Sequence, residues 1–252
     1  MQEELHSEQA DIETASDDYA TRFSGKVGEY FLKTQEDITL KFLEEENIKT
    51  ILDVGGGHAQ LAVPLVKKGY DVTVTGSDIS CRNRLDKFLA KGSFKFKECD
   101  FLALPYPDNS FDAVISFRLI MHEKNWEILI KEMCRVSKQV VIIDYPDKCS
   151  FNILNKIFFK AKKSFEKNTR TFKTFSRKEL KNIFIKNGFT QFSLKPQYFL
   201  PMVLHRAMKN VAISKNLEFL FGIIGLKYMF GTPVIMKMKR NNVVSKKNYN
   251  DS

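Results

Sequence analysis

The sequence predicts an α/β fold in which a mainly parallel sheet is covered by helices on both faces. Short apolar segments alternate with segments of helical spacing from residue 50 to residue 144. The apolar segment at residues 50–54, TILDV, is followed directly by three glycines. Parallel strands need long crossovers, which are usually helices, so this alternation is typical of a parallel sheet. A chain of 252 residues is long enough for one such domain with additions.

The spacing of apolar residues predicts the helices and strands up to residue 144. Residues 22–46 place apolar side chains at helical spacing and predict one or two N-terminal helices. The expected strands are residues 50–55, 72–76, 94–98, 113–117 and 139–144. The expected helices are residues 58–68, which Gly69 ends, 81–91 and 124–137.

The alternation breaks after Asp144. Residues 151–165 have the spacing of an amphipathic basic helix. Residues 176–187 predict another helix, which Ser176 and Glu179 begin as a capping box. Residues 189–194 alternate like a strand, residues 201–221 predict a helical insertion, and residues 232–238 predict the last strand.

Charge divides the chain into three parts. Residues 1–20 carry seven acidic side chains and no Lys or Arg, which predicts a disordered acidic arm. Residues 21–145 are neutral, whereas residues 146–252 carry 22 basic and five acidic side chains. A basic face of this kind can meet nucleic acid, anionic lipid or an acidic small molecule, and a solvated lysine-rich surface is the alternative.

The cysteines and the apolar runs indicate in which cellular compartment we expect the protein. The four cysteines are widely spaced and form no CxxC pair, which argues against a zinc site and for a reducing compartment. The first twenty residues lack the apolar core of a signal peptide. The apolar run at residues 217–236 contains Glu218, Lys227 and Pro233, so we expect a buried helix and strand there. We expect a cytoplasmic protein, with peripheral contact to the membrane as an open alternative.

The glycine turn at residues 55–57 is the most informative motif. Asp53 precedes the turn, and Asp78 and Asp100 lie just beyond the second and third expected strands. The carboxyl ends of parallel strands meet at one edge of a sheet, where ligands bind. The turn and the three carboxylates therefore predict one ligand site.

This pattern resembles the class I S-adenosylmethionine (SAM) methyltransferases, in particular the type-11 group that includes quinone-biosynthesis enzymes. The family motif is an acidic residue followed by Gly-x-Gly-x-Gly, and residues 53–59 match it with Ala59 in place of the third glycine. The resemblance implies a Rossmann-like, doubly wound, seven-stranded sheet, mainly parallel with an antiparallel last strand, plus helical insertions. It implies one methyltransferase domain at residues 21–239, with a SAM-binding core at 48–145, acceptor-side insertions at 146–230 and a polar tail at 240–252.

The resemblance also implies the cofactor, SAM, and its contacts. Asp78 would accept both ribose hydroxyls, Asp100 would accept from the adenine amine, and Phe101 would pack on the adenine ring. An N-cap role is the alternative for Asp78. The implied cofactor-binding residues are Asp53, Gly55, Gly56, Gly57, Asp78, Asp100, Phe101 and Ser116. By the same resemblance, the helix segment around Glu132 and Arg135 has a packing role, and Asp112 is expected to be structural.

The acceptor residues are expected after the fourth and fifth strands and in the insertions. His122 is the candidate general base because its ordinary pKa lies near neutrality, and a role in orienting the next helix is the alternative. The candidate acceptor-binding residues are Arg118, Tyr145, Arg170, His205 and Arg206. For Arg170, His205 and Arg206, a surface or structural role is the alternative.

These observations predict a SAM-dependent methyltransferase that acts on a small or lipid-like acceptor by O- or C-methylation. An RNA methyltransferase, suggested by the basic C-terminal third, and a non-catalytic SAM-binding regulator are the alternatives. The Asn-Pro-Pro-Tyr type of motif is absent after the fourth strand, so we do not expect nucleic acid as a partner. We expect no metal.

Overall fold

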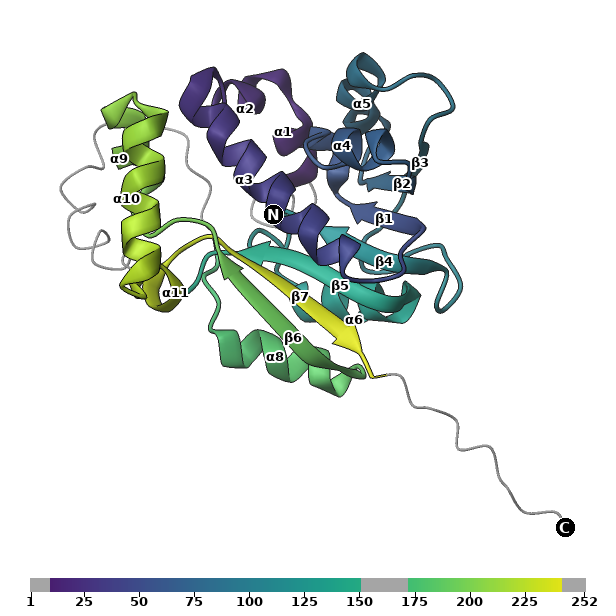
Figure 1. The fold of residues 1–252 in the computed structure, drawn as a ribbon. Helices are drawn as coiled ribbons and strands as arrows, with labels where there is room; N and C mark the ends of the chain where they lie inside the picture. Colours follow the sequence, from purple (N-terminus) through teal and green to yellow (C-terminus); the bar gives the residue numbers. More distant parts are fainter. Residues whose placement is uncertain (1–9, 151–171, 242–252) are drawn as a thin grey trace, which may run out of the picture.

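The computed structural model describes residues 10–150 and 172–241 and arranges them as a seven-stranded sheet between two layers of helices (Figure 1). The strand order is β3-β2-β1-β4-β5-β7-β6. Strands β1 to β5 pair in parallel, and β7 runs antiparallel to both β5 and β6. This confirms the predicted sheet. The strands are β1 (Thr50–Val54), β2 (Asp71–Gly76), β3 (Lys95–Glu98), β4 (Phe111–Ser116), β5 (Ser137–Tyr145), β6 (Phe189–Pro196) and β7 (Val234–Arg240).

Helices cover both faces of the sheet (Figure 1). One face carries α3 (Gly25–Glu44), α4 (Ala62–Lys67) and α5 (Asn83–Phe88), and the other carries α6 (Trp126–Val136) and α8 (Arg177–Lys186). Two short 3-10 helices, η2 (Gly56–His58) and η3 (Ile79–Arg82), follow β1 and β2. Between β6 and β7 the chain forms α9 (Met202–Met208), α10 (Val211–Ile223) and α11 (Leu226–Phe230).

The alternation of side chains along the strands divides the core into two clusters. On β5, Val140 and Ile142 face the cluster beneath α3 and α4, whereas Val141 and Ile143 face the cluster beneath α6 and α8. All four side chains are fully buried. Burying one aliphatic side chain contributes about 1.5–3 kcal/mol, so the central strands anchor the fold.

The N-terminal segment departs from its prediction, because residues 10–20 are helical rather than disordered. They form α1 (Ala10–Ala15) and most of α2 (Asp17–Thr21). The Asp11 carboxylate is buried and accepts hydrogen bonds from the backbone N–H of Ser77 at 2.7 Å and from its hydroxyl at 2.6 Å. Asp17 pairs with Arg84 at 2.8 Å. Acidic composition predicts solvation, but here two of the carboxylates find specific donors on the domain.

Downstream of β5, one expectation is met and others lie outside the described residues. The capping box of α8 is present: the Ser176 hydroxyl accepts from the Glu179 N–H at 3.1 Å, and the Glu179 carboxylate accepts from the Ser176 N–H at 3.4 Å. The helix expected at residues 151–165 and the candidate Arg170 fall outside the described residues, as do residues 1–9 and 242–252.

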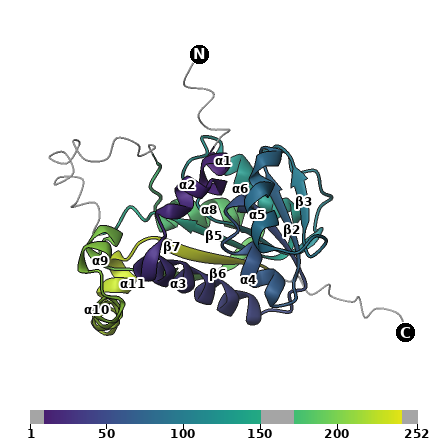
Figure 2. The ribbon, with the colours of Figure 1, turned by 90° about the horizontal axis from the view of Figure 1, so that it is seen from above.

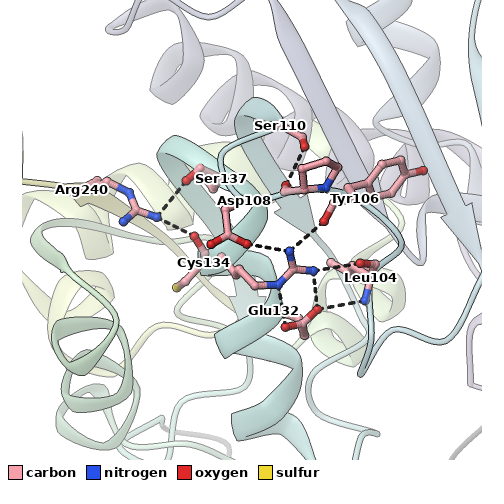
Figure 3. Close-up of polar contacts among 10 residues, drawn as sticks. Leu104, Tyr106, Asp108, Ser110, Glu132, Cys134, Ser137 and Arg240 are labelled. Carbon is pink, nitrogen blue, oxygen red and sulfur yellow. Dashed lines mark hydrogen bonds and ion pairs between the residues drawn. The ribbon is translucent and has the colours of Figure 1, made fainter.

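Arg135 on α6 fixes the loop that leads into β4, in which Figure 3 labels Leu104 and Tyr106. Its guanidinium donates to the Glu132 carboxylate at 2.7 and 2.9 Å and to the Leu104 and Tyr106 carbonyls at 2.8 and 2.7 Å. Glu132 in turn accepts the Leu104 N–H at 3.0 Å. Glu132 and Arg135 therefore fix a loop by hydrogen bonds, and the helix segment around them packs as expected, since Met133, Cys134 and Val136 are buried in the core. Asp112 is structural as expected, since it accepts the N–H groups of Lys49 and Thr50.

We expect the substitution Arg135→Ala to lower the free energy of unfolding by about 2–3 kcal/mol, because two carbonyls and a carboxylate lose charged donors in a partly buried site. Arg135→Lys should recover only part of this loss, since one ammonium cannot reach all three acceptors. Urea unfolding followed by circular dichroism measures both effects. Lys131→Ala, at an exposed position on the same helix, is the control and should change stability by less than about 0.5 kcal/mol.

Candidate functional site

The glycine turn connects β1 to η2, and its geometry explains its composition. Gly55 has a φ of +74°, which a side chain would strain. A Cβ at Gly56 would lie 2.2 Å from the Asp53 carboxyl group, and one at Gly57 would lie 2.7 Å from the Cys81 carbonyl oxygen. Helix α1 packs against the turn, since a Cβ at Gly57 would also lie 3.0 Å from that of Ala15. The turn is thus a tightly enclosed backbone segment.

Asp53 is a buried carboxylate beneath this turn. Both of its oxygens lack a hydrogen-bond partner within the described residues, and burial raises the pKa of Asp53 to about 7. An uncompensated buried carboxylate is costly, so such groups concentrate at functional sites. Nearby His58 is neutral, because burial, with the Arg118 charge, lowers its pKa to about 3.

Asp78 and Asp100 lie at the ends of β2 and β3, as predicted. Asp78 is the N-cap of η3 and accepts the Ser80 N–H at 2.8 Å. Hydrogen bonds from the Ser80 hydroxyl and then from the Ser80 N–H lower the pKa of Asp78. Its capping role is therefore real, and a second role toward a ligand stays a prediction. Asp100 is exposed and accepts the Leu102 N–H at 2.8 Å. Phe101 is buried in the cluster beneath α6, so its stacking on a ring also stays a prediction.

Ser116 does not present its hydroxyl to a ligand. The side chain is fully buried at the end of β4, and its hydroxyl donates to the Val54 carbonyl at 2.9 Å. This bond joins β4 to β1. The hydroxyl of Ser116 therefore has a structural role in the sheet, and its role in cofactor binding stays a prediction.

A cavity of about 190 Å³ lies at the carboxyl ends of β4 and β5. Most of its wall is aromatic or aliphatic, and a few polar side chains complete it. The apolar lining residues are Tyr19, Phe23, Phe31, Met121, Pro146, Phe172, Tyr198, Met202 and Pro233. The polar ones are Gln35, Arg118, Asp144, Tyr145 and Gln197. An apolar hollow with a few placed polar groups is the usual form of a small-molecule site.

Arg118 is the most constrained residue of this cavity. Its φ of +60° is rare for an arginine, and its side chain is buried. Its backbone N–H donates to the Asp144 carboxylate at 2.6 Å, and its guanidinium donates to the Gln35 amide oxygen at 3.3 Å. The guanidinium also stacks 4.1 Å from the Phe23 ring centre. Backbone strain in a non-glycine residue clusters at functional sites, so Arg118 is the first candidate for ligand contact.

Several polar groups of the cavity keep unused hydrogen-bonding capacity. Among the described residues, no hydrogen-bond partner exists for Arg118 Nη1, the Tyr145 hydroxyl or Gln197 Nε2, although all three atoms are buried. Burial raises the pKa of Asp144 to about 6, against the opposing effect of the Arg118 N–H. Buried polar atoms are normally satisfied, so these three atoms suit a polar ligand group.

The remaining predicted acceptor residues lie away from this cavity. His205 is buried and pairs with Glu218 at 3.0 Å, which makes it structural. Arg206 donates to the Arg22 carbonyl at 2.8 Å and borders a separate hollow beside residues 21–28. These contacts favour the structural alternative for His205 and Arg206, and their acceptor roles stay a prediction. His122 follows Met121 but does not line the cavity, so its role as a base stays a prediction.

Of the cavity residues, only Arg118 and Tyr145 were predicted from the sequence, and Tyr19, Phe23 and Gln35 are among those that were missed. Tyr19 was assigned to the acidic arm. Gln35 did leave a signal, because it interrupts an apolar helix face, four residues after Phe31. A polar residue on the buried face of a helix usually has a specific partner, here Arg118. Within the described part of the chain, no three His, Cys, Asp or Glu residues cluster so that they could hold a metal ion.

Comparison with known proteins agrees with this architecture. The profile of a methyltransferase domain matches residues 52–143. Ajmaline N-methyltransferase from Rauvolfia serpentina is 34% identical over 99 residues, which are 37% of this chain and 34% of that protein. Demethylmenaquinone methyltransferase from Thermus thermophilus is 29% identical over 127 residues, 46% of this chain and 56% of that protein. The crystal structure of magnesium protoporphyrin IX methyltransferase from Synechocystis PCC 6803 superposes with a TM-score of 0.63 at 13% identity, over 96% of this chain and all of that one.

The first two matches span about a third and just over half of those relatives' lengths. The likeness to the Synechocystis structure is a likeness of fold. The domain match at residues 52–143, the relatives and the seven-stranded sheet support a class I SAM-dependent methyltransferase of the type-11 group.

Proposed function

We propose that this protein transfers the methyl group of SAM to a small or lipid-like acceptor, by O- or C-methylation. One observation carries the proposal: the aromatic cavity lies directly beside the glycine turn. Arg118 lines the cavity, and its neighbour Leu119 comes within 3.0 Å of the Cβ position at Gly55. A donor held at the turn and an acceptor in the cavity would then meet at residues 118–119.

The residues at the turn fit SAM. Asp53 offers a buried carboxylate without a hydrogen-bond partner in the described chain, and SAM carries an α-ammonium group and a sulfonium. Asp78 is kept ionised by its lowered pKa and would accept hydrogen bonds from the ribose hydroxyls. When bound, SAM supplies an electrophilic methyl group on sulfur. The Synechocystis structure of the same fold contains bound SAH, which supports a donor site at this edge.

The cavity residues would contribute by position and by exclusion of water. Phe23, Phe31 and Tyr198 form an apolar wall against which a flat or aliphatic acceptor can be oriented. Arg118 Nη1 and the Tyr145 hydroxyl offer polar contacts to an oxygen of the acceptor. Asp144 and Gln35 hold Arg118 in place. His122 is proposed as a base only for an acceptor that must lose a proton.

The names of the relatives support an organic acceptor of modest size. One relative is named for ajmaline and others for demethylmenaquinone. The first name specifies a nitrogen acceptor and the second specifies no atom, so the names support the class of acceptor and leave its identity open.

A transfer assay distinguishes the three candidate functions. The protein is incubated with methyl-labelled SAM and a cell extract, which is then divided into organic, RNA and protein fractions. We expect the label in the organic fraction. Label in RNA would support the RNA methyltransferase instead, and SAM binding without transfer would support a regulatory protein.

We expect Asp78→Asn to weaken SAM binding by about 10- to 100-fold, because the ribose hydroxyls lose a charged acceptor. Asparagine is also a good N-cap, so η3 should persist. Isothermal titration calorimetry measures the affinity, and Asp86→Asn on the neighbouring helix α5 is the matched control. Equal affinities for Asp78→Asn and the wild type would remove Asp78 from the donor site.

The raised pKa of Asp53 predicts how stability depends on pH. Its pKa rises from 3.8 to about 7 on folding, so its contribution favours the folded state below pH 3.8 and is lost as the pH rises through 7. Relative to the wild type, Asp53→Asn should therefore gain roughly 2–3 kcal/mol more at pH 8 than at pH 5. Urea titrations of both proteins without SAM, at pH 5 and at pH 8, measure this difference. Any effect of the asparagine amide on stability that is the same at both pH values cancels when the two are subtracted.

Saturating SAM provides the second readout for Asp53. If the ammonium of SAM lies beside the carboxylate, SAM should stabilise the wild type at pH 8 far more than Asp53→Asn. A gain for Asp53→Asn that is the same at both pH values would show that Asp53 is not buried as an ionisable group.

A further inference from the structure

Helices α9, α10 and α11 lie together at one end of the molecule, far from α4, α5 and β2 in both views (Figures 1 and 2). Their outward side is apolar. Phe219 is 70% exposed and Ile223 is 67% exposed, on a helix whose sequence is largely hydrophobic. The exposed apolar face of this end is formed by Ile213, Phe219, Leu220, Ile223, Tyr228 and Met229.

Helix α10 is inverted relative to an ordinary surface helix. Its buried residues are the polar Ser214 and Glu218, whereas the apolar side chains of Ile213, Phe219, Leu220 and Ile223 are exposed. An ordinary surface helix buries its apolar stripe and exposes its polar one. The inversion therefore indicates that the outer side of α10 meets an apolar medium.

Glu218 explains why α10 is fixed in this orientation. Its carboxylate accepts the N–H groups of Phe199 and Leu200, each at 2.9 Å, and pairs with His205 at 3.0 Å. These bonds satisfy a buried charge and tie α10 to the segment after β6. Turning the helix to bury Phe219 would expose apolar partners and break this network, so the outward apolar face is built into the fold.

The charge around the face identifies the medium. Glu218 is the one acidic residue between Met202 and Phe230, and it is buried. The same stretch contains four cations: Arg206, Lys209, Lys215 and Lys227. A second copy of the chain would bring cations against cations, whereas a layer that is anionic outside and apolar inside complements both features.

We propose that the face formed by α10 and α11 binds the surface of a membrane that contains anionic phospholipid. None of the described helices is long and apolar enough to cross a membrane, so the contact is peripheral. Met202 lines the cavity, and the next residues, Val203 and Leu204, are exposed apolar side chains. The face thus begins where the cavity wall ends, and a lipid-like molecule could pass from the membrane to the cavity. Binding itself does not depend on the proposed methyl transfer.

Co-sedimentation with vesicles, without SAM or acceptor, tests the proposal. We expect the wild type to bind vesicles of phosphatidylcholine with phosphatidylglycerol and to bind pure phosphatidylcholine vesicles weakly. Phe219→Ser combined with Ile223→Ser should reduce binding at least tenfold. Ile128→Ser combined with Ile185→Ser, at exposed positions of α6 and α8, should leave it unchanged. Lys209→Ala and Lys215→Ala should each reduce binding about fivefold.

Thermal denaturation and light scattering of the same variants identify the other possible occupants of the face. Equal melting temperatures and monomer masses with loss of vesicle binding support the proposal. A wild type that binds no vesicles but forms a dimer sensitive to Phe219→Ser would overturn it in favour of self-association. A melting temperature that falls in this variant, without vesicle binding by the wild type, would overturn it in favour of cover by another part of the chain.

Discussion

The hydrogen bond from the Arg118 N–H to the Asp144 carboxylate determines the geometry of the whole cavity. It joins the ends of β4 and β5 and holds Arg118 in a left-handed conformation that costs on the order of 1–3 kcal/mol. A short bond to a buried carboxylate can offset that cost. With Arg118 fixed, its guanidinium reaches Gln35 on α3 and stacks on Phe23. One bond thus connects the sheet, a covering helix and the N-terminal segment.

The sheet and the turn could be predicted because their signals are local. A strand such as β5 is a continuous run of apolar residues, and the glycine turn is set by its own backbone and by Asp53 two residues before it. The carboxylates at strand ends follow from the same alternation. The antiparallel pairing of β7 with β5 was implied by the family resemblance, because the residues of β7 alone do not indicate the direction of the strand.

The cavity could be predicted only in part, because its residues depend on tertiary contacts. Composition suggested a disordered arm, yet Tyr19 reaches the cavity because Asp11 and Asp17 find donors far along the chain. His205 looked available for a ligand, but its partner Glu218 lies 13 residues further on. Ser116 looked available as well, but its hydroxyl donates to the Val54 carbonyl on the neighbouring strand β1. In each case the role of the residue depends on a partner elsewhere in the chain, which a local sequence pattern does not indicate.

The bond between Asp11 and Ser77 indicates that the smallest fragment of this protein that folds correctly includes helix α1. The two residues are 66 positions apart, and Ser77 directly precedes Asp78. A fragment cut at the boundaries of the matching domain, residues 52–143, would lose α1 and leave Ser77, Cys81 and the glycine turn uncovered. An expression fragment that begins after Asp11 would therefore disturb the loop that contains Ser77 and Asp78, although the cut lies far from that loop in the sequence.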